Sequence, residues 1–240
     1  MNQNKTSGPT RIGLGLAAIG RPEYINLRQE KDPNKSESSY RRRTLDLLDH
    51  AYASGIRDFD TAASYGKGEQ FLQMWYDLHP YEDLILSSKW GYTYVANWEI
   101  GYSGSHEIKE HSLSKLKEQW TNAKKLLPGL KIYQIHSATF ESGVLENKEV
   151  LDELHRIKKT DGIKIGLSVS GANQKDVVLT ASKVRVGGEE LFDSFQVTYN
   201  ILDASAHEML RFLLEKGKNV IIKEAMANGR LLQNRHFPQY

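Results

Sequence analysis

Short apolar runs alternate with longer amphipathic stretches along the whole chain. A strand repeats its pattern every two residues and a helix about every 3.6, so the short runs indicate strands and the long stretches helices. Such alternation predicts βαβ units around a parallel sheet. The expected strands are Arg11–Ala18, Arg57–Ala62, Leu84–Gly91, Ile132–Ala138, Lys164–Ser170, Ser194–Asn200 and Asn219–Ala225. The expected helices lie at about Ser39–Ser54, Glu69–Leu78, Glu107–Leu127, Asn147–Lys159, Gln174–Ser182 and Ser205–Lys216.

The expected strands carry different residues on their two faces. One face of the sixth strand is apolar and the other is polar, with Phe195, Val197 and Tyr199 opposite Gln196, Thr198 and Asn200. An open sheet covered by helices on both sides would instead give near-continuous apolar runs. A barrel places one face of every strand toward a polar site at its C-terminal mouth. The alternation therefore favours a (β/α) barrel of the TIM type over an open sheet.

The glycines of the first expected strand do not form a dinucleotide fingerprint. Gly13 and Gly15 are followed by Ala18, where the GxGxxG pattern needs a third glycine, and Gly20 comes too late. We interpret these glycines as structural. No linker rich in Pro, Gly or Ser divides the 240 residues, so we expect one domain over residues 1–240.

Composition narrows the functional classes. With 39% hydrophobic and 26% charged residues, the chain has no apolar run near the roughly 18 to 20 residues of a spanning helix and no apolar leader. We therefore expect a cytoplasmic protein without a membrane partner. The formal net charge of +2 does not suggest nucleic-acid binding, and Arg41-Arg42-Arg43 is most simply a solvated helix face.

The absence of cysteine excludes disulfides, thiolate nucleophiles and sulfur-ligated zinc. His106 and His111 lie five residues apart, which is not the spacing of a helical metal motif such as HExxH. We expect no metal site, so any redox chemistry would fall to a bound organic cofactor.

Five polar residues lie at or just beyond the C-terminal ends of expected strands, where a barrel gathers side chains into one cavity. They are Asp60, Tyr65, Lys89, His136 and Gln196. Each has a simpler interpretation alone: a turn cap for Asp60, surface positions for Tyr65 and Lys89, and a core histidine for His136.

Together, four of these residues could protonate a carbonyl oxygen. A phenol titrates near 10, so Tyr65 needs a nearby cation to release its proton at neutral pH, and Lys89 can supply that charge. Asp60 can hold the lysine charged and in position. His136 can donate a hydrogen bond to the substrate oxygen as negative charge develops there.

The segment from Asp60 to Glu69, DTAASYGKGE, resembles the aldo-keto reductase signature, in which a tyrosine follows an aspartate by five residues. Leu84–Lys89 resembles the family's third strand, which ends in its lysine, and Ile132–His136 resembles its fourth, which ends in histidine. The resemblance runs from about Arg11 to Leu232 and includes counterparts of all four members of the family's catalytic tetrad.

The resemblance implies a carbonyl reductase that uses NADPH, with NADH possible, on a small-molecule aldehyde or ketone. It implies that Tyr65 is the general acid, Lys89 lowers its pKa, Asp60 holds Lys89 and His136 orients the substrate. Ser168 and Gln196 correspond to residues that contact the nicotinamide carboxamide. The further cofactor-binding residues implied are Asn200, Lys223 and Arg230.

The chain also departs from the family pattern. Val169 stands where many relatives have a carboxamide-binding asparagine, and Lys223 replaces the aromatic residue that stacks on nicotinamide. After Leu231 only nine residues remain, so we expect a barrel of about seven strands that is incomplete at its C-terminal end. The eighth strand and last helices, which in relatives grip the adenosine phosphate, would be missing. A trimmed chain, a partner that fills the gap and a degenerate relative all remain open.

Two other functions are open alternatives. A barrel lysine such as Lys89 or Lys164 could form a Schiff base in a lyase. Alternatively, the chain could be a catalytically silent scaffold that binds cofactor or a protein partner.

The loop Ile19–Ser38 would overhang the barrel mouth and select substrate. Aromatic residues after the third strand could line a pocket or simply pack their own loop: Trp90, Tyr92, Tyr94 and Trp98. The sequence does not indicate the oligomeric state.

Overall fold

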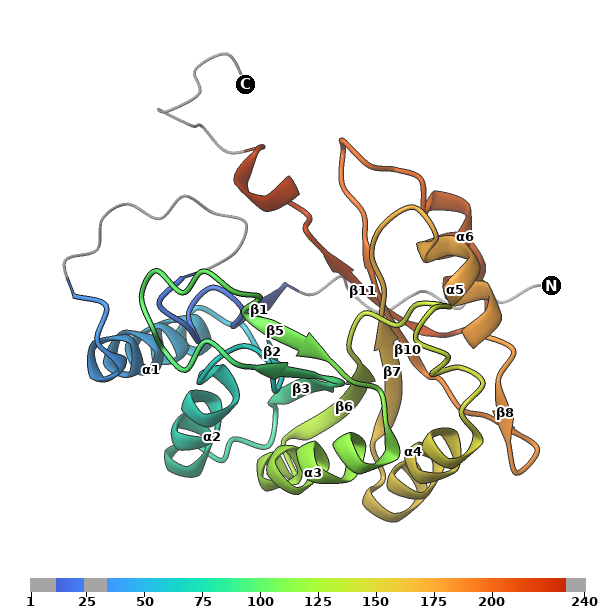
Figure 1. Ribbon diagram of the computed structural model, residues 1–240, viewed down its shortest axis with the longest axis horizontal. Coiled ribbons are helices and arrows are strands. Elements are labelled where there is room, and N and C mark those ends of the chain that lie inside the picture. The colour runs from blue at the N-terminus through green and yellow to red at the C-terminus, as the bar shows by residue number, and fades with distance from the viewer. Residues whose placement is uncertain (1–11, 24–33, 232–240) are drawn as a thin grey trace.

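The computed structural model describes residues 12–23 and 34–231, and its main feature is one curled parallel sheet (Figure 1). Seven strands pair in the order β1-β2-β3-β6-β7-β10-β11, and every pairing in this sheet is parallel. The strands are β1 Gly13–Gly15, β2 Asp58–Asp60, β3 Ile85–Trp90, β6 Leu130–Ile135, β7 Lys164–Ser168, β10 Ser194–Thr198 and β11 Asn219–Lys223. All seven expected strands are confirmed, most of them shorter than expected.

The helices follow the strands and cover the outer face of the sheet (Figure 1). They are α1 Glu37–Ala53, α2 Gly68–Leu78, α3 Leu113–Ala123, α4 Lys148–Asp161, α5 Gln174–Ala181 and α6 His207–Glu215. Short 3-10 helices η1 Lys124–Leu126 and η2 Ala227–Gly229 complete the helical segments. Helix ends follow local chemistry: Asn147 caps α4 by accepting a hydrogen bond from the Val150 amide, and Gly162 ends it at φ 66°.

The two faces of the sheet differ as the alternation of residues predicted. Phe59, Leu86 and Phe195 point outward and are buried in the core beneath the helices. Lys89 and Gln134 are register partners on the other face, as are Ser168 and Gln196. Burying one large apolar side chain contributes about 1.5–3 kcal/mol, so the outer face stabilises the fold while the inner face can hold polar groups. This arrangement confirms the barrel-like interpretation over the open sheet.

The segment between β3 and α3 differs from expectation. We expected a helix over Glu107–Leu127, but Glu107–Lys109 forms β5, which pairs antiparallel with β4 Tyr92–Tyr94. The helix begins only after Ser112, whose hydroxyl accepts a hydrogen bond from the Lys115 amide at 3.1 Å. A side-chain cap thus sets the start of α3, and the β4–β5 hairpin projects from the strand that carries Lys89.

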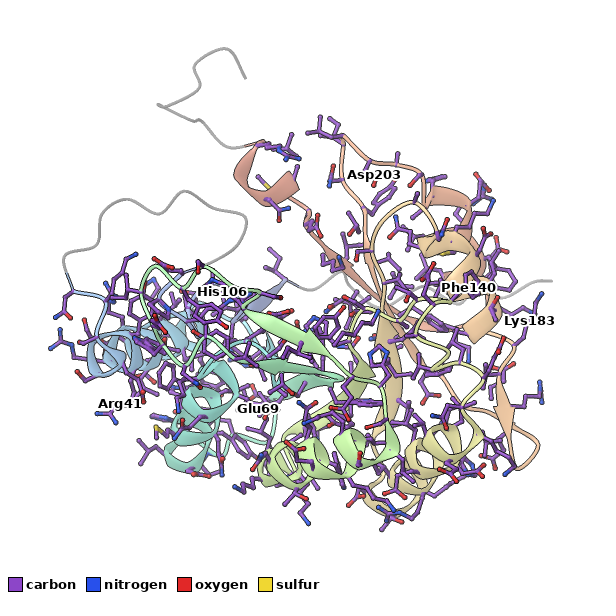
Figure 2. The ribbon with its side chains drawn as sticks, in the orientation of Figure 1. Arg41, Glu69, His106, Phe140, Lys183 and Asp203 are labelled. Carbon is purple, nitrogen blue, oxygen red and sulfur yellow. The ribbon has the colours of Figure 1, made fainter. Side chains whose placement is uncertain are left out.

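Three other regions differ from the elements expected from the sequence or lie outside the described residues. The expected first strand, Arg11–Ala18, is confined to β1, because the Leu16 carbonyl accepts from the Ile19 and Gly20 amides and starts a turn. Arg11 and residues 24–33 of the expected overhanging loop lie outside the described residues. A second hairpin joins β8 Arg185–Val186 to β9 Glu189–Glu190 and was not expected. The three consecutive arginines are exposed on α1, with Arg41 pointing away from the sheet (Figure 2).

In the part of the chain that the structure describes, no helix combines the length and apolar character needed to cross a membrane.

Candidate active site

The turn after β2 carries Tyr65 and is fixed on both sides. The Ala63 amide donates to the Lys89 carbonyl at 3.0 Å, which ties the turn to β3. On the other side the Lys67 amide donates to the Gly20 carbonyl at 2.6 Å. A Cβ at Gly20 would lie 2.1 Å from the Tyr65 carbonyl oxygen, so only glycine permits this close approach. The loop after β1 therefore packs directly against the backbone of Tyr65, which positions the phenol.

Lys89 extends from β3 into the inner face and is 1% exposed. Its ammonium donates to the Asp60 carboxylate and, at 2.9 Å, to the Thr61 carbonyl. The carboxylate of Asp60 also accepts hydrogen bonds from the Ser87 hydroxyl at 2.6 Å and from the Gln134 amide at 3.4 Å. Three adjacent strands thus supply one ion pair and its supporting hydrogen bonds, as a buried charge requires.

The charge of Lys89 is set by opposing effects. Burial acts to lower the pKa of Lys89, but the neighbouring Asp60 carboxylate and the Tyr65 phenol outweigh burial and raise it. The Lys89 ammonium lies 4.8 Å from the centre of the Tyr65 ring. A permanent cation therefore sits beside the phenol, where it stabilises the phenolate over the neutral form.

His136 follows β6 and meets Tyr65 edge-on, with ring centres 5.4 Å apart and planes at 85°. Its Nδ1 lies 3.3 Å from the Ser64 hydroxyl. Burial and the nearby charge of Lys89 hold the pKa of His136 well below its usual value near 6.5. The imidazole is therefore neutral at pH 7, and it can donate a hydrogen bond without carrying charge.

Sequence reasoning considered His111 only as a metal ligand and missed its contact with His136. The His111 Nε2 donates to the His136 carbonyl at 3.0 Å, and burial lowers the pKa of His111 to about 4. The ring occupies the space beside Gly91, where a Cβ would lie 2.1 Å from the His111 ring. Gly91 directly follows β3 with φ at 104°, and a glycine at that point was the one signal available in the sequence.

Glu69, the last residue of the signature-like segment, lies on the other side of the sheet from Lys89. Ser88 and Lys89 are consecutive on β3 and so point to opposite faces, and the Ser88 hydroxyl donates to the Glu69 carboxylate. Burial raises the pKa of Glu69. This carboxyl group therefore anchors α2 to the outer face of the sheet and does not join the polar site.

Ser168 and Gln196 lie side by side on β7 and β10, as their register pairing requires. The Ser168 hydroxyl accepts a hydrogen bond from the Ser137 amide at 2.9 Å. Gln196 is 4% exposed, and no hydrogen bond from the described residues engages its side-chain amide, which is not one of the fully buried polar groups without a partner and so reaches solvent. An amide that reaches solvent and has no protein partner can pair with a ligand amide such as the nicotinamide carboxamide.

Lys223 and Asn200 belong to a second polar group at the ends of β10 and β11. The Lys223 ammonium donates to the Thr198 hydroxyl at 2.8 Å and to the Glu224 carboxylate at 2.9 Å. The Asn200 amide donates to the Glu224 carbonyl at 3.0 Å. Glu224 thus organises this group, and sequence reasoning had not singled it out. Arg230 is exposed after η2, and no hydrogen bond or ion pair links it to the rest of the group as described.

The aromatic residues after β3 separate into two kinds. Trp90 is buried in the core, and Trp98 packs edge-on against Tyr40 at 5.4 Å while donating to the Lys35 carbonyl. Tyr92 instead lies 4.9 Å from the His136 ring. Trp98 therefore holds this loop against α1, whereas Tyr92 borders the polar site. Across the ranges 12–23 and 34–231, no three metal-ligating side chains cluster.

The chain is similar in sequence to a known oxidoreductase. The chain is 26% identical over 235 residues to the uncharacterized oxidoreductase YqkF of Bacillus subtilis (strain 168), covering 93% of this chain and 63% of YqkF. The chain therefore spans less than two thirds of the length of that relative.

Solved structures show the same fold. PA4992 of Pseudomonas aeruginosa has a TM-score of 0.66 and 23% identity, covering 90% of this chain and 74% of that one. The aldo-keto reductase AKR11C1 of Bacillus halodurans, in its holo form, has a TM-score of 0.64 and 20% identity, covering 91% of this chain and 63% of that one. At these identities the likeness concerns the fold, which is that of the (β/α)8 barrel. Residues 11–240 match the aldo/keto reductase family, and the chain belongs to that family.

Proposed function

We propose that this protein is an NAD(P)H-dependent oxidoreductase that reduces an aldehyde or ketone to an alcohol. The observation that supports this most directly is Lys89, which is fully buried between Asp60 and the Tyr65 phenol. A cation held beside a phenol serves proton transfer to an oxygen that gains negative charge.

In the proposed reaction, Tyr65 donates its phenolic proton to the substrate carbonyl oxygen. Lys89 stabilises the phenolate that remains, and Asp60 keeps the ammonium in place. The neutral imidazole of His136 hydrogen-bonds the same substrate oxygen and fixes its direction relative to Tyr65. The nicotinamide, when bound, supplies the hydride.

The cofactor site that we propose uses both polar groups on the later strands. Ser168 and the neighbouring amide of Gln196 would hold the carboxamide. Asn200 and Lys223 would border the nicotinamide, and Arg230 would meet the phosphates. We propose NADPH as the cofactor, with NADH as the alternative.

The experiment measures NADPH binding by fluorescence and NADPH oxidation with a panel of aldehydes and ketones. We expect Tyr65→Phe to lower kcat by about 10²- to 10⁴-fold while cofactor binding is kept, because only the proton donor is lost. Tyr81→Phe, at an exposed tyrosine, is the matched control and should change neither quantity. The proposal fails if NADPH neither binds nor is oxidised, or if Tyr65→Phe turns over as fast as the wild type.

The lyase alternative is weakened by the geometry. A Schiff base needs a neutral amine, whereas Lys89 is held as a cation by Asp60. Lys164 is exposed at the start of β7, at the end of the sheet away from Tyr65. The silent scaffold stays a second candidate because Lys223, on the proposed cofactor side, is engaged by Glu224. It predicts binding of NADPH or of a protein partner without turnover.

A further inference from the structure

The β4–β5 hairpin turns one of its two faces toward the candidate active site. Tyr92 and Lys109 are cross-strand partners, so their side chains share a face of the hairpin. The Tyr92 ring lies 4.9 Å from the His136 ring, and both residues are partly exposed. Ile108 points to the opposite face and is 56% exposed. Lys109 therefore lies on the side of the hairpin that faces the polar site.

The Lys109 ammonium is held close to this site by its contacts. It lies 5.7 Å from the centre of the Tyr92 ring and donates to the Thr139 hydroxyl, in the loop after β6, at 3.1 Å. The ammonium is thus no more than about 10.6 Å from the centre of the His136 ring, which is the sum of the two distances to the Tyr92 ring centre. Burial and, next to it, the charge of Lys109 lower the pKa of His111. A small molecule bound at His136 can therefore reach this cation.

The charge of Lys109 is less well compensated than that of the other cations around the site. Three of these cations each pair with a carboxylate: Lys89 with Asp60, Arg21 with Glu107 and Lys223 with Glu224. Lys109 forms no ion pair with any carboxylate that the structure describes. Partial burial lowers the pKa of Lys109, and the attraction of the more distant Glu141 offsets only part of that effect. An ammonium in such surroundings gains stabilisation from an anionic ligand.

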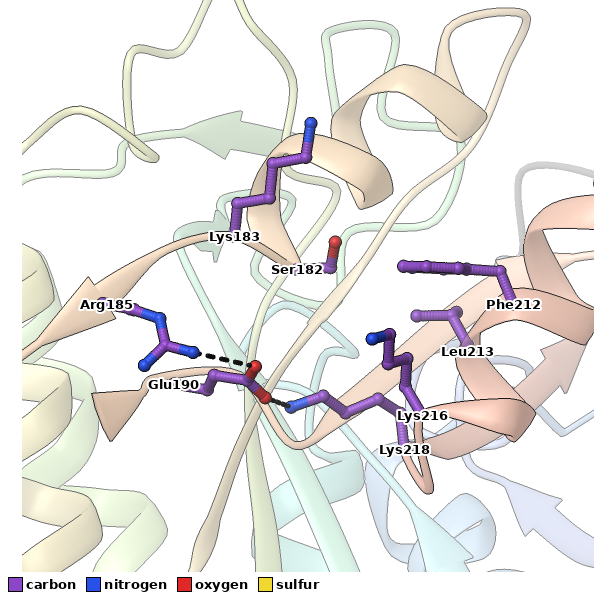
Figure 3. A pocket seen from close by; sticks show the side chains of 8 residues that line it. All are labelled: Ser182, Lys183, Arg185, Glu190, Phe212, Leu213, Lys216 and Lys218. Atoms are coloured by element: carbon purple, nitrogen blue, oxygen red, sulfur yellow. Dashed lines mark hydrogen bonds and ion pairs between the residues drawn. The ribbon is translucent and has the colours of Figure 1, made fainter. Parts of the chain in front are cut away.

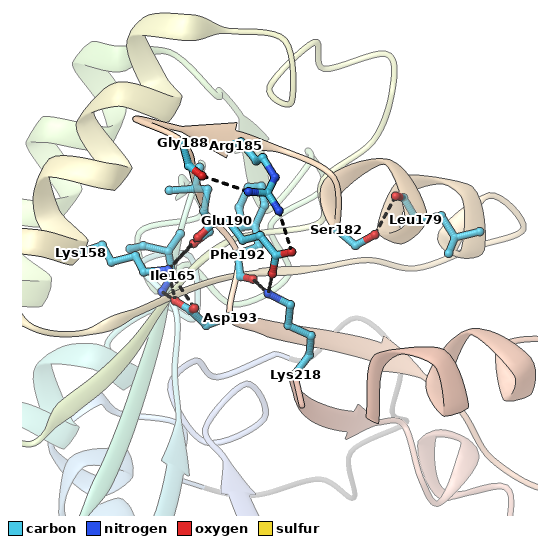
Figure 4. A network of polar contacts seen from close by, with 11 residues as sticks. Lys158, Ile165, Leu179, Ser182, Arg185, Gly188, Glu190, Phe192, Asp193 and Lys218 are labelled. Atoms are coloured by element: carbon cyan, nitrogen blue, oxygen red, sulfur yellow. Dashed lines mark hydrogen bonds and ion pairs between the residues drawn. The ribbon is translucent and has the colours of Figure 1, made fainter. Parts of the chain in front are cut away.

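Cations near the N-terminal ends of the later strands show how the fold compensates a structural charge. Lys218 and Arg185 both pair with Glu190, at 2.7 and 3.4 Å (Figure 3). Lys158 pairs with Asp193 at 2.8 Å and also donates to two backbone carbonyls (Figure 4). Each of these side chains ties two segments together through a carboxylate. Lys109, which has one neutral hydroxyl as its hydrogen-bond partner, does not follow this pattern.

We propose that Lys109 binds a carboxylate of the substrate, so that the substrate is a short oxo acid. This inference rests on the proposed function. The carbonyl oxygen would lie between Tyr65 and His136, the methylene carbons along the Tyr92 ring and the carboxylate at Lys109. A hydrogen bond at each end takes up about 2.8 Å, and the remaining distance suits a chain of a few carbons. The hydride adds to the carbonyl carbon and the Tyr65 proton to its oxygen, while the carboxylate keeps its charge.

The test compares 4-oxobutanoate with its methyl ester, which has the same chain but no charge, in NADPH oxidation by the whole chain. We expect kcat/KM to be at least tenfold higher for the acid, mainly through a lower KM. Lys109→Met should lower this preference at least tenfold, whereas Lys109→Arg should keep it because the charge remains. Lys117→Met, at an exposed lysine of α3, is the matched control and should keep the wild-type preference. A purely structural role of Lys109 would change both substrates alike and leave their ratio unchanged.

A binding measurement separates this inference from the proposed function. The Thr139 amide resonance should shift saturably with 4-hydroxybutanoate, at least tenfold more weakly with 1-butanol, and not with either compound in Lys109→Met. If neither carbonyl compound is reduced, the proposed function fails, and the 4-hydroxybutanoate titration still decides whether Lys109 binds a carboxylate. The inference is overturned if the ester is reduced as well as the acid, if Lys109→Met keeps the preference, or if 4-hydroxybutanoate binds the wild type and this variant equally.

Discussion

Two polar groups at the carboxyl ends of the strands are built in different ways. On the earlier strands, the Lys89 side chain is completely buried, and its carboxylate partner Asp60 accepts further hydrogen bonds from β3 and β6. On the later strands, the Lys223 side chain is 24% exposed and is paired with the next residue in the chain, Glu224. The first group is fixed by the sheet itself. The second depends on one strand end and the loop that follows it.

Backbone conformation shows the same difference. Glu224, Ala227 and Asn228 all have positive φ values, of 57°, 49° and 55°. Residues other than glycine adopt this region at some cost, so the loop after β11 is held by its contacts and not by local preference. The two groups should therefore respond differently to the loss of one charge, strongly on the earlier strands and weakly on the later ones.

The largest effect should come from Lys89→Met, which leaves Asp60 and its hydrogen-bond donors without their cation. Breaking a buried ion pair by removing one partner costs about 3–5 kcal/mol, and we expect a loss of this size in the free energy of unfolding. Under the proposed function, reduction of the best carbonyl substrate should fall by at least 10²-fold. Urea unfolding and NADPH oxidation measure the two effects.

Lys223→Met is the matched comparison for that variant, because it removes the same charge from the other polar group. A partly exposed ion pair contributes about 0–1 kcal/mol, so the loss of stability should be small. Equal destabilisation by the two substitutions would show that the contrast between the groups is wrong.

The sequence predicted the order and number of the main strands because their pattern is set by the helices outside and the polar site inside. The prediction from sequence was wrong where a local side-chain cap determines the start of a helix. The residues around Glu107 have a helix-like composition, but Ser112 caps α3 and leaves β5 free to pair with β4. The β8–β9 hairpin has only two residues in each strand, too few to show a periodic pattern.

The candidate site shows the same limit. Asp60, Lys89 and His136 could be assigned because strand ends converge in any barrel, and the structure does bring them to Tyr65. The roles assigned to these residues stay predictions. The contact of His111 with the His136 carbonyl could not be predicted, since it depends on how the β4–β5 hairpin folds back. The link between Lys223 and Glu224 depends on a left-handed backbone that the sequence does not indicate.

A smaller effect should appear in the dependence of stability on pH. His111 has a pKa of about 4 when folded and near 6.5 when unfolded, so the unfolded chain binds more protons between these values. The stabilisation is fully present above pH 6.5 and is lost as the pH falls toward 4, by up to about 3 kcal/mol. His136 shifts in the same direction and adds to this dependence.

His111→Phe keeps a ring beside Gly91 but cannot bind a proton. We expect a loss of about 1 kcal/mol at pH 7, from the hydrogen bond to the His136 carbonyl, and a shallower fall in stability between pH 6.5 and 4. His50→Phe, on the exposed end of α1, is the control for histidine loss alone. An unchanged slope in the His111 variant would mean that its ring is not held neutral.

The smallest effect should come from Glu224→Gln. The amide keeps the size of the side chain, and its single oxygen can still accept from Thr198, but it loses the charge that attracts Lys223 and the second oxygen that accepts from Asn228. We expect less than about 1 kcal/mol in stability, since the Glu224 side chain is one third exposed. Under the proposed function, the KM for NADPH should rise by about three- to tenfold with kcat kept, which corresponds to up to about 1.4 kcal/mol of lost positioning.

This variant tests whether the second group serves the cofactor or only the loop. Burial acts to raise the pKa of Glu224, but hydrogen bonds led by Lys223 lower it, so wild-type stability should also decline as the pH falls below about 4.5. The glutamine variant should lose that decline along with its higher KM. Glu208→Gln on exposed α6 provides the control. If the pH profile changes but the KM for NADPH does not, the Lys223–Glu224 ion pair serves only to hold the loop after β11. Lys223 would then no longer belong to the proposed cofactor site.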